Sequence, residues 1–229
     1  MIHKQILLFG FLLLQFNAFS QVYNVSVDDR NKAIDLTNQA ITKIEGDKLD
    51  DAILFLVKSL SVDSVYLPTY LQFYRIYSLN NEYSTTILPY IKKGKRIFED
   101  DDELSFYLGE IYRSNSDLKN ALLEYNAAIR LSKTNGEDFH LVHSYYFNRG
   151  NCYYKADLLD SAIVDYTYAL KLKPDYSFAY MNRGICLYRR GKPAEACVDW
   201  QKSEELGCDS ATEYLEKYCK NHNSKPNKQ

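Results

Sequence analysis

Small and apolar residues recur along this chain at helical spacing, and their arrangement returns with a period of about 34 residues. Small residues align with small ones, and bulky apolar residues with bulky ones, at four of six places or better. One copy consists of Gly150, Tyr153, Ala162, Tyr166, Ala169 and Pro174, and the next of Gly184, Leu187, Ala196, Trp200, Ser203 and Cys208. Self-similarity at this period indicates stacked helical hairpins. The sequence therefore predicts an all-α, right-handed α-solenoid of about five helix-turn-helix repeats with a C-terminal capping helix.

Five predicted helix pairs and one final helix account for most of the chain. The pairs are 30–44 with 49–60, 66–79 with 83–98, 102–114 with 117–131, 143–155 with 158–172, and 177–190 with 193–206; the capping helix is 211–219. The step from Gly109 to Gly150 is longer than the step from Gly150 to Gly184, so we expect an insertion of seven residues around 134–142, where Asn135-Gly136 breaks the helix. The acidic run 99–103 is expected to support a helix start, because carboxylates stabilise a helix N-terminus.

The residue types in the pattern have a steric explanation. A glycine on the first helix and an alanine on the second let the two backbones of one hairpin approach closely, and a large ring fills the wedge between hairpins. A hairpin alone leaves one face exposed to water, so only stacking buries it. The residues assigned to this role are Gly109, Ala121 and Tyr125, then Gly150, Ala162 and Tyr166, then Gly184, Ala196 and Trp200.

Charge and composition exclude some classes of partner. The formal net charge is −2, and the apolar and charged fractions are those of an ordinary soluble protein. Nothing in this balance draws the chain to nucleic acid or to an anionic membrane. No segment after the first twenty residues is long and apolar enough to span a bilayer.

The N-terminus has the pattern of an export signal. Lys4 precedes an apolar stretch over residues 6–16, and Ala18-Phe19-Ser20 offers small residues for cleavage before Gln21. The alternative, a membrane anchor, needs about 20 apolar residues, and this stretch is shorter. We expect a signal peptide at 1–20, a leader at 21–29, the repeat domain at 30–220 and a disordered polar tail at 221–229. The protein is then exported, to the periplasm or outside the cell if bacterial.

Export affects the interpretation of the five cysteines, because thiols persist poorly in oxidising compartments. Cys197 and Cys219 lie equally far from the turn at Gly207-Cys208, on either side of it, so they are expected to meet across an antiparallel helix pair. The alternative is two buried free thiols. The odd count leaves at least one cysteine unpaired, and the pairing of Cys152, Cys186 and Cys208 stays open. No spacing typical of a zinc site is present.

The repeated residues resemble a known family. Asn148-Arg149-Gly150-x-x-Tyr153, followed by Ala162, Tyr166, Ala169 and Pro174, is similar to the tetratricopeptide repeat signature. The third and fifth repeats match well, the first has Ala40 in place of the glycine, and the second departs most because its frame is ambiguous by one residue. The ending 196–219 resembles the close of many exported bacterial tetratricopeptide proteins, which also implies the Cys197–Cys219 pair.

This resemblance implies a non-enzymatic adaptor or scaffold that binds a protein or peptide segment in a concave groove lined by the first helix of each repeat. The implied partner-binding residues are Phe106, Tyr107, Phe147, Asn148, Asn151, Tyr154, Phe178, Asn182 and Tyr188. Aromatic rings separated by amides suit an extended peptide. The alternative is that several of these rings pack between helices. Phe147 and Phe178 occupy places where a carboxylate-binding lysine is needed, so that charge clamp is expected to be absent.

Other functions have less support in the sequence. A structural subunit of a cell-envelope or secretion assembly is the main alternative. No nucleophile elbow, phosphate-binding glycine loop or HExxH motif is present, and no cofactor is expected. Asp138, His140 and His143 are close in sequence but lack a further soft ligand, so we expect no metal.

Overall fold

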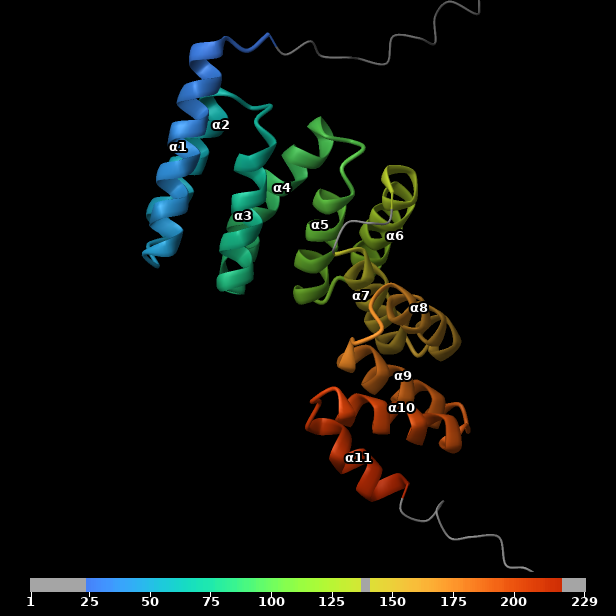
Figure 1. The fold of residues 1–229 in the computed structure, drawn as a ribbon. Helices are drawn as coiled ribbons and strands as arrows, with labels where there is room; N and C mark the ends of the chain where they lie inside the picture. The colour runs from blue at the N-terminus through green and yellow to red at the C-terminus, as the bar shows by residue number, and fades with distance from the viewer. Residues whose placement is uncertain (1–23, 137–140, 220–229) are drawn as a thin grey trace, which may run out of the picture.

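The computed structural model describes residues 24–136 and 141–219, and these form helical hairpins that follow one another along a curved path (Figure 1). The helices are α1 (Val27–Glu45), α2 (Leu49–Val62), α3 (Leu67–Leu79), α4 (Ser84–Ile97), α5 (Asp102–Ser114), α6 (Leu118–Asn135), α7 (Val142–Lys155), α8 (Leu159–Leu172), α9 (Ser177–Arg189), α10 (Pro193–Glu205) and α11 (Ser210–Tyr218), with a 3₁₀ turn η1 (Asn81–Tyr83). No strand occurs in these ranges. The predicted all-α solenoid of five hairpins and a capping helix is confirmed.

Helix boundaries agree with the predicted ones to within a few residues, with one correction at the start. The first helix begins at Val27 instead of residue 30, and its N-cap is Ser26, whose hydroxyl accepts a hydrogen bond from the Asp29 amide at 3.0 Å. Asp28 and Asp29 therefore lie in the first turn, where they stabilise the positive end of the helix. The predicted signal peptide and the polar tail lie outside the described residues. Among the described helices, none combines the length and apolar character needed to cross a membrane.

Glycines on the first helices of the last three hairpins allow close contact with a ring on the second helix. A Cβ placed on Gly109 would lie 2.6 Å from the Tyr125 ring, and one on Gly184 would lie 2.6 Å from the indole of Trp200. Gly150 lies in the same relation to Tyr166, at 2.8 Å. These separations are too short for any real side chain. The steric role assigned to the glycines thus agrees with the packing.

The second hairpin uses the same principle with the roles reversed. Here the glycine, Gly94, lies on the second helix, and the ring, Tyr70, comes from the first; a Cβ on Gly94 would lie 2.8 Å from that ring. Ile87 and Ile91 occupy the places that Ala121 and Tyr125 hold one repeat later. The two helices of this hairpin approach each other closely over a shorter stretch than those of the other hairpins. This reversal explains why the second repeat departs from the family pattern.

Buried charge pairs join the two helices of each of the last two hairpins. Arg149 Nε and Nη2 donate to Asp165 at 2.8 and 2.6 Å, and its Nη1 reaches Asn126 on the preceding hairpin at 2.7 Å. Arg183 repeats the arrangement in the next hairpin with Asp199, at 2.8 and 2.7 Å. Both aspartates are almost fully buried, so each arginine satisfies a charge that water cannot reach.

Candidate partner-binding surface

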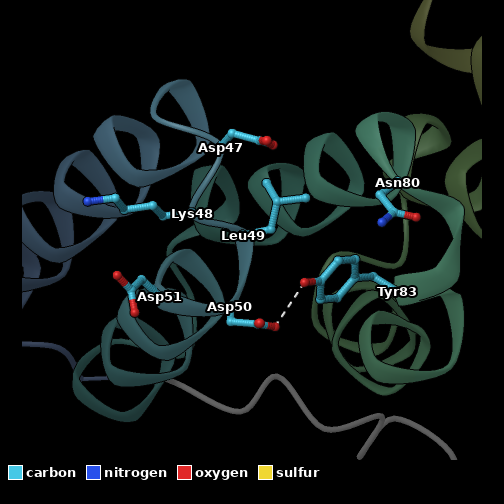
Figure 2. A pocket seen from close by; sticks show the side chains of 7 residues that line it. All are labelled: Asp47, Lys48, Leu49, Asp50, Asp51, Asn80 and Tyr83. Carbon is cyan, nitrogen blue, oxygen red and sulfur yellow. Dashed lines mark hydrogen bonds between the residues drawn. The ribbon is translucent and has the colours of Figure 1, made fainter.

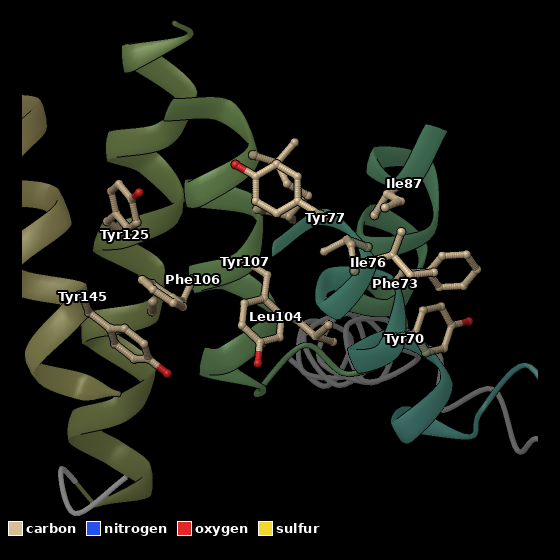
Figure 3. Packing of buried hydrophobic residues seen from close by; sticks show 14 of the residues in the cluster. Tyr70, Phe73, Ile76, Tyr77, Ile87, Leu104, Phe106, Tyr107, Tyr125 and Tyr145 are labelled. Atoms are coloured by element: carbon tan, nitrogen blue, oxygen red, sulfur yellow. The ribbon is translucent and has the colours of Figure 1, made fainter. Parts of the chain in front are cut away.

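Two of the predicted partner-binding residues belong to the core, which corrects their assignment. The Tyr107 ring stacks on Tyr74 with centroids 3.5 Å apart, and Phe106 packs against Tyr145 at 4.7 Å. Both side chains are buried within the cluster that joins the second, third and fourth hairpins (Figure 3). A partner cannot reach them without separating the hairpins.

The neighbouring charged residues of α5 are also used internally. Arg113 Nη2 donates to the Glu110 carboxylate at 2.9 Å, and the Tyr125 hydroxyl donates to the same carboxylate. Burial, followed by the charge of Glu110, raises the pKa of Tyr125 well above its usual range, so this phenol stays a donor. Because α5 uses these groups in its own packing, the third repeat contributes little to an open surface.

The first helices of the fourth and fifth hairpins carry a ladder of amides instead. Asn182 Nδ2 donates to Asn151 Oδ1 at 2.9 Å, which joins α9 to α7. The Tyr166 hydroxyl donates to the same oxygen at 2.8 Å, and Asn151 Nδ2 reaches Asn148 Oδ1 at 3.3 Å. All three asparagines are half-buried. This network uses only part of the hydrogen-bonding capacity of Asn148 and Asn182, so their amides can also bond to a partner.

Aromatic side chains lie beside the ladder near the start of α9. Phe147 and Tyr176 have ring centroids 4.7 Å apart, and Phe178 meets Tyr176 edge-on at 6.4 Å. Phe178 leaves 59% of its surface exposed, although phenylalanine is usually buried. Burial raises the pKa of Tyr176 to about 12. The result is an apolar platform with one ring open to solvent.

Further aromatic residues lie toward the end of α9. The Arg189 guanidinium lies 5.4 Å from the centre of the Tyr154 ring and pairs with Asp157 at 2.7 Å. Tyr188 is 38% exposed and packs against Tyr218 of the capping helix at 4.5 Å. Tyr188 therefore holds α11 in place as well as facing solvent. We call Asn148, Asn151, Tyr154, Phe178, Asn182 and Tyr188, together with Phe147, the α7–α9 surface.

Hollows lie elsewhere, at the turns within the hairpins. One of about 410 Å³ is lined by Asp47, Lys48, Leu49, Asp50, Asp51, Asn80 and Tyr83, and the Tyr83 hydroxyl donates to Asp50 at 2.9 Å (Figure 2). A second, of about 320 Å³, occupies the equivalent turn of the fourth hairpin, where Arg190 pairs with Asp160. Both are open notches between successive turns, where Tyr83 contacts Asp50 in the first and Arg190 contacts Asp160 in the second. Such open gaps between neighbouring repeats lack the enclosure that is typical of small-molecule binding sites.

Metal or thiol chemistry has no support in the described part of the chain. No group of three His, Cys, Asp or Glu side chains gathers there. His143 packs edge-on against Tyr176 at 5.1 Å, while Asp138 and His140 lie outside the described residues. Burial raises the pKa of the Cys152 and Cys186 thiols to about 11, which leaves them protonated and weakly nucleophilic.

The structure joins Cys197 to Cys219 in a disulfide, with Cα atoms 5.8 Å apart, and leaves three buried cysteines unpaired. The bonded pair links α10 to the capping helix at the level where the two antiparallel helices were expected to meet. Cys208 lies at the turn between them.

Comparisons with known proteins identify one repeat by sequence and the fold by similar structures. Residues 143–176 match the tetratricopeptide repeat family. No curated protein matches the chain in sequence. Among solved structures, YrrB, described as "a TPR protein with an unusual peptide-binding site", is 20% identical with a TM-score of 0.64, over 82% of this chain and 94% of YrrB.

Two further structures are similar. MamA is 21% identical with a TM-score of 0.66, over 82% of this chain and 96% of MamA. PilW, described as a "widely conserved type IV pilus biogenesis factor", is 14% identical with a TM-score of 0.64, over 80% of this chain and 90% of PilW. At these identities the likeness establishes the fold alone.

Proposed function

Because this chain is a tetratricopeptide-repeat protein with the fold of a right-handed solenoid, we propose that it is a non-enzymatic adaptor that binds a peptide or protein segment on its α7–α9 surface. The observation that carries the proposal is the ladder of Asn148, Asn151 and Asn182 beside the exposed ring of Phe178. Half-buried amides with spare hydrogen-bonding capacity can exchange water for the backbone groups of a peptide and leave no donor or acceptor unpaired.

The chemistry of this surface favours an extended segment. Amide side chains can bond to the N–H and C=O groups of a peptide backbone, and exposed rings supply apolar contact for its side chains. Phe147 and Phe178 offer no positive charge at the places where a terminal carboxylate would need one. We therefore expect an internal stretch of a partner chain to bind, with at least one apolar side chain against Phe178. The peptide-binding site named for YrrB lends support, since that protein has the same fold.

We also propose that the protein is exported and acts in the periplasm or outside the cell. The N-terminal sequence supports this, and the Cys197–Cys219 bond is consistent with an oxidising compartment. The expected result in non-reducing mass spectrometry of protein recovered from that compartment is one linked peptide pair containing Cys197 and Cys219. Cys152, Cys186 and Cys208 should be alkylated only after unfolding. Free thiols at both Cys197 and Cys219 would end the proposal of a disulfide.

The binding test starts with a partner recovered by affinity capture of the mature protein from envelope extract of the organism that makes it. The dissociation constant is then measured by calorimetry for the unaltered protein and for the double variant Tyr154→Ala, Phe178→Ala. We expect at least about a tenfold weaker complex, because exposed aromatic anchors dominate such interfaces. Leu79→Ala, at another exposed apolar residue on α3, is the matched control and should bind normally. Equal affinity of the double variant and the control would contradict the proposal.

A second candidate is a structural subunit of a cell-envelope or secretion assembly. Apolar side chains on the outer faces of the second helices favour it, because such side chains invite contact with another surface. The pilus biogenesis role named for PilW is compatible with it. A subunit of this kind would tolerate the Tyr154 and Phe178 changes. It would respond to changes on the outer faces of the second helices, on the surface of the Ala33 end of the solenoid, or in α11.

A further inference from the structure

Four exposed apolar side chains occupy the same place in four different hairpins. A single exposed leucine or valine is ordinary, but a set that returns with the repeat forms a pattern. They are Leu54 on α2 (60% exposed), Leu123 on α6 (58%), Val164 on α8 (67%) and Val198 on α10 (67%). Val164 lies one repeat before Val198, and Leu123 precedes Val164 by one repeat plus the insertion. On α4 the corresponding place, two residues after Ile87, is Pro89. We call the four exposed residues the outer row.

The outer row faces away from the core. Leu54 lies two residues after Ala52 and two before Leu56, both fully buried, and a spacing of two residues turns a helix by about 200°. Val198 lies in the same relation to Ala196 and Trp200. Each residue of the row is therefore on the opposite side of its helix from the packed face, and the four point outward along the stack of second helices.

Charges of opposite sign flank the row on three of its four helices. On α2, Asp50 lies four residues before Leu54 and Lys58 four residues after it, so all three share one face. Glu195 and Lys202 flank Val198 on α10, and Asp160 and Lys171 flank Val164 on α8. Helix α6 departs from the pattern, because Lys119 lies four residues before Leu123, where α2 and α8 have an aspartate.

This arrangement is complementary to itself. We infer that a second copy of this chain docks on the end of the outer row formed by Val164 and Val198, in the last two hairpins, with the two-fold axis running along these two residues. Such an axis places each second helix antiparallel to its counterpart, so the acidic start of one faces the basic end of the other. Val164 then meets Val164 of the other copy, and Val198 meets Val198. Antiparallel pairing also brings opposite ends of the helix dipoles together.

The flanking charges are available for such pairing. Lys192 reaches Glu195 at 3.2 Å, and Lys202 reaches Glu205 at 3.1 Å, but both pairs are about half exposed. Arg190 reaches Asp160 at 2.7 Å, and both of these side chains are likewise exposed. Exposed pairs contribute little, so exchanging them for contacts across an interface costs little. Removal of the apolar row from water then supplies the net favourable free energy of association.

Pairing through the outer faces has a consequence for binding. The α7–α9 surface lies on the first helices and stays open in such a dimer. Two copies joined back to back would present two such surfaces, and a partner with repeated segments would be held by both. This consequence rests on the proposed function, whereas the dimer itself does not.

Sedimentation velocity of the mature protein, over a wide range of concentration and at low salt, tests the inference directly. We expect a monomer–dimer equilibrium, and the double variant Val164→Glu, Val198→Glu should raise the dimer dissociation constant by about tenfold or more. Leu79→Glu is the matched control, because Leu79 is 59% exposed but lies on α3, outside the row. Circular dichroism confirms that each variant keeps its helical content. A monomer at every concentration would overturn the inference, as would a dimer unaffected by the double variant or lost in Leu79→Glu.

Charge exchange gives a second and sharper test. Lys202→Glu places acid against Glu195 of the other copy and should weaken the dimer several-fold. Adding Glu195→Lys to the same chain reverses both signs and should restore the affinity. The control Lys202→Glu, Glu82→Lys has the same net charge but places the new lysine at an exposed position of η1, outside the row, and should not recover the affinity. Recovery with Glu195→Lys alone then depends on the antiparallel arrangement. Failure of the exchanged pair to recover would rule out the proposed axis.

Discussion

Replacing Trp200 by alanine is expected to lower the free energy of unfolding by about 3–5 kcal/mol, the range for large buried aromatic residues. The side chain is fully buried and is the one tryptophan of the chain. Its ring packs against Tyr214 at 5.0 Å and Tyr218 at 5.8 Å, and its indole N–H donates to the Met181 carbonyl at 3.3 Å. Alanine would leave a cavity between α9, α10 and the capping helix, and that carbonyl would lose its indole donor.

Urea unfolding followed by circular dichroism measures this loss, and hydrogen exchange locates it. Repeat arrays are held by contacts between neighbours, so α9 to α11 should exchange faster while α1 to α6 keep their protection. Gln201→Ala is the control, because Gln201 follows Trp200 on the same helix but is exposed and lies outside the outer row. A loss spread evenly over all hairpins would contradict the repeat-by-repeat description.

Removal of the Arg183 charge is expected to be as damaging. In Arg183→Met the carboxylate of Asp199, almost fully buried, would lose two hydrogen bonds of 2.8 and 2.7 Å. Breaking a buried pair by removing one partner costs about 3–5 kcal/mol, because an uncompensated charge stays out of water. Urea unfolding again supplies the measurement.

Two further variants separate charge burial from other effects. Asp199→Asn added to Arg183→Met removes the stranded charge and should recover a large part of the stability. Arg189→Met breaks the ion pair with Asp157, in which the Arg189 side chain is 43% exposed and the Asp157 side chain 74%. This change should alter the free energy of unfolding by no more than about 1 kcal/mol. If Arg189→Met proved as costly as Arg183→Met, burial would not be the reason for the effect.

Most of the fold could be predicted from the sequence, because the solenoid repeats one local solution. The spacing of Gly150, Ala162 and Tyr166 predicts which helix faces touch within a hairpin. The same residue types return at Gly184 and Trp200, which predicts that hairpins stack. Helix starts were harder, since Ser26, Asp28 and Asp29 are all good capping residues and only the hydrogen bond shows that Ser26 is used.

The second hairpin could not be resolved from the sequence for a physical reason. Close packing needs one small and one large residue at a contact, and it is indifferent to which helix supplies which. Gly94 and Tyr70 exchange these places, so a pattern that expects glycine on the first helix finds no frame.

The binding residues show the same limit. Phe106 and Tyr107 occupy the same positions in their helix as Phe147 and Asn148 do in theirs. The residues that pack against the two pairs are different. Tyr74 covers Tyr107 and Tyr145 covers Phe106, and both come from other hairpins. The position of a residue within one repeat cannot predict the neighbour that another repeat supplies.

The buried Arg–Asp pairs were missed, although the sequence holds a signal for them. Arg149 and Asp165 have the same separation along the chain as Arg183 and Asp199, which repeat both residue types in the next hairpin. Identical charges that return with the repeat, at places between apolar residues, indicate a structural pair and not a solvated face.

The central claim is that helices touch where small side chains recur, and Gly184→Ala tests it most directly. Its one added carbon would lie 2.6 Å from the Trp200 indole, so we expect a loss of about 1–3 kcal/mol in urea unfolding, together with a shift of the Trp200 fluorescence. Gly46→Ala is the matched control, because its added carbon meets nothing closer than 3.5 Å. A Gly184→Ala variant as stable as the Gly46→Ala variant, with unchanged fluorescence, would contradict the account.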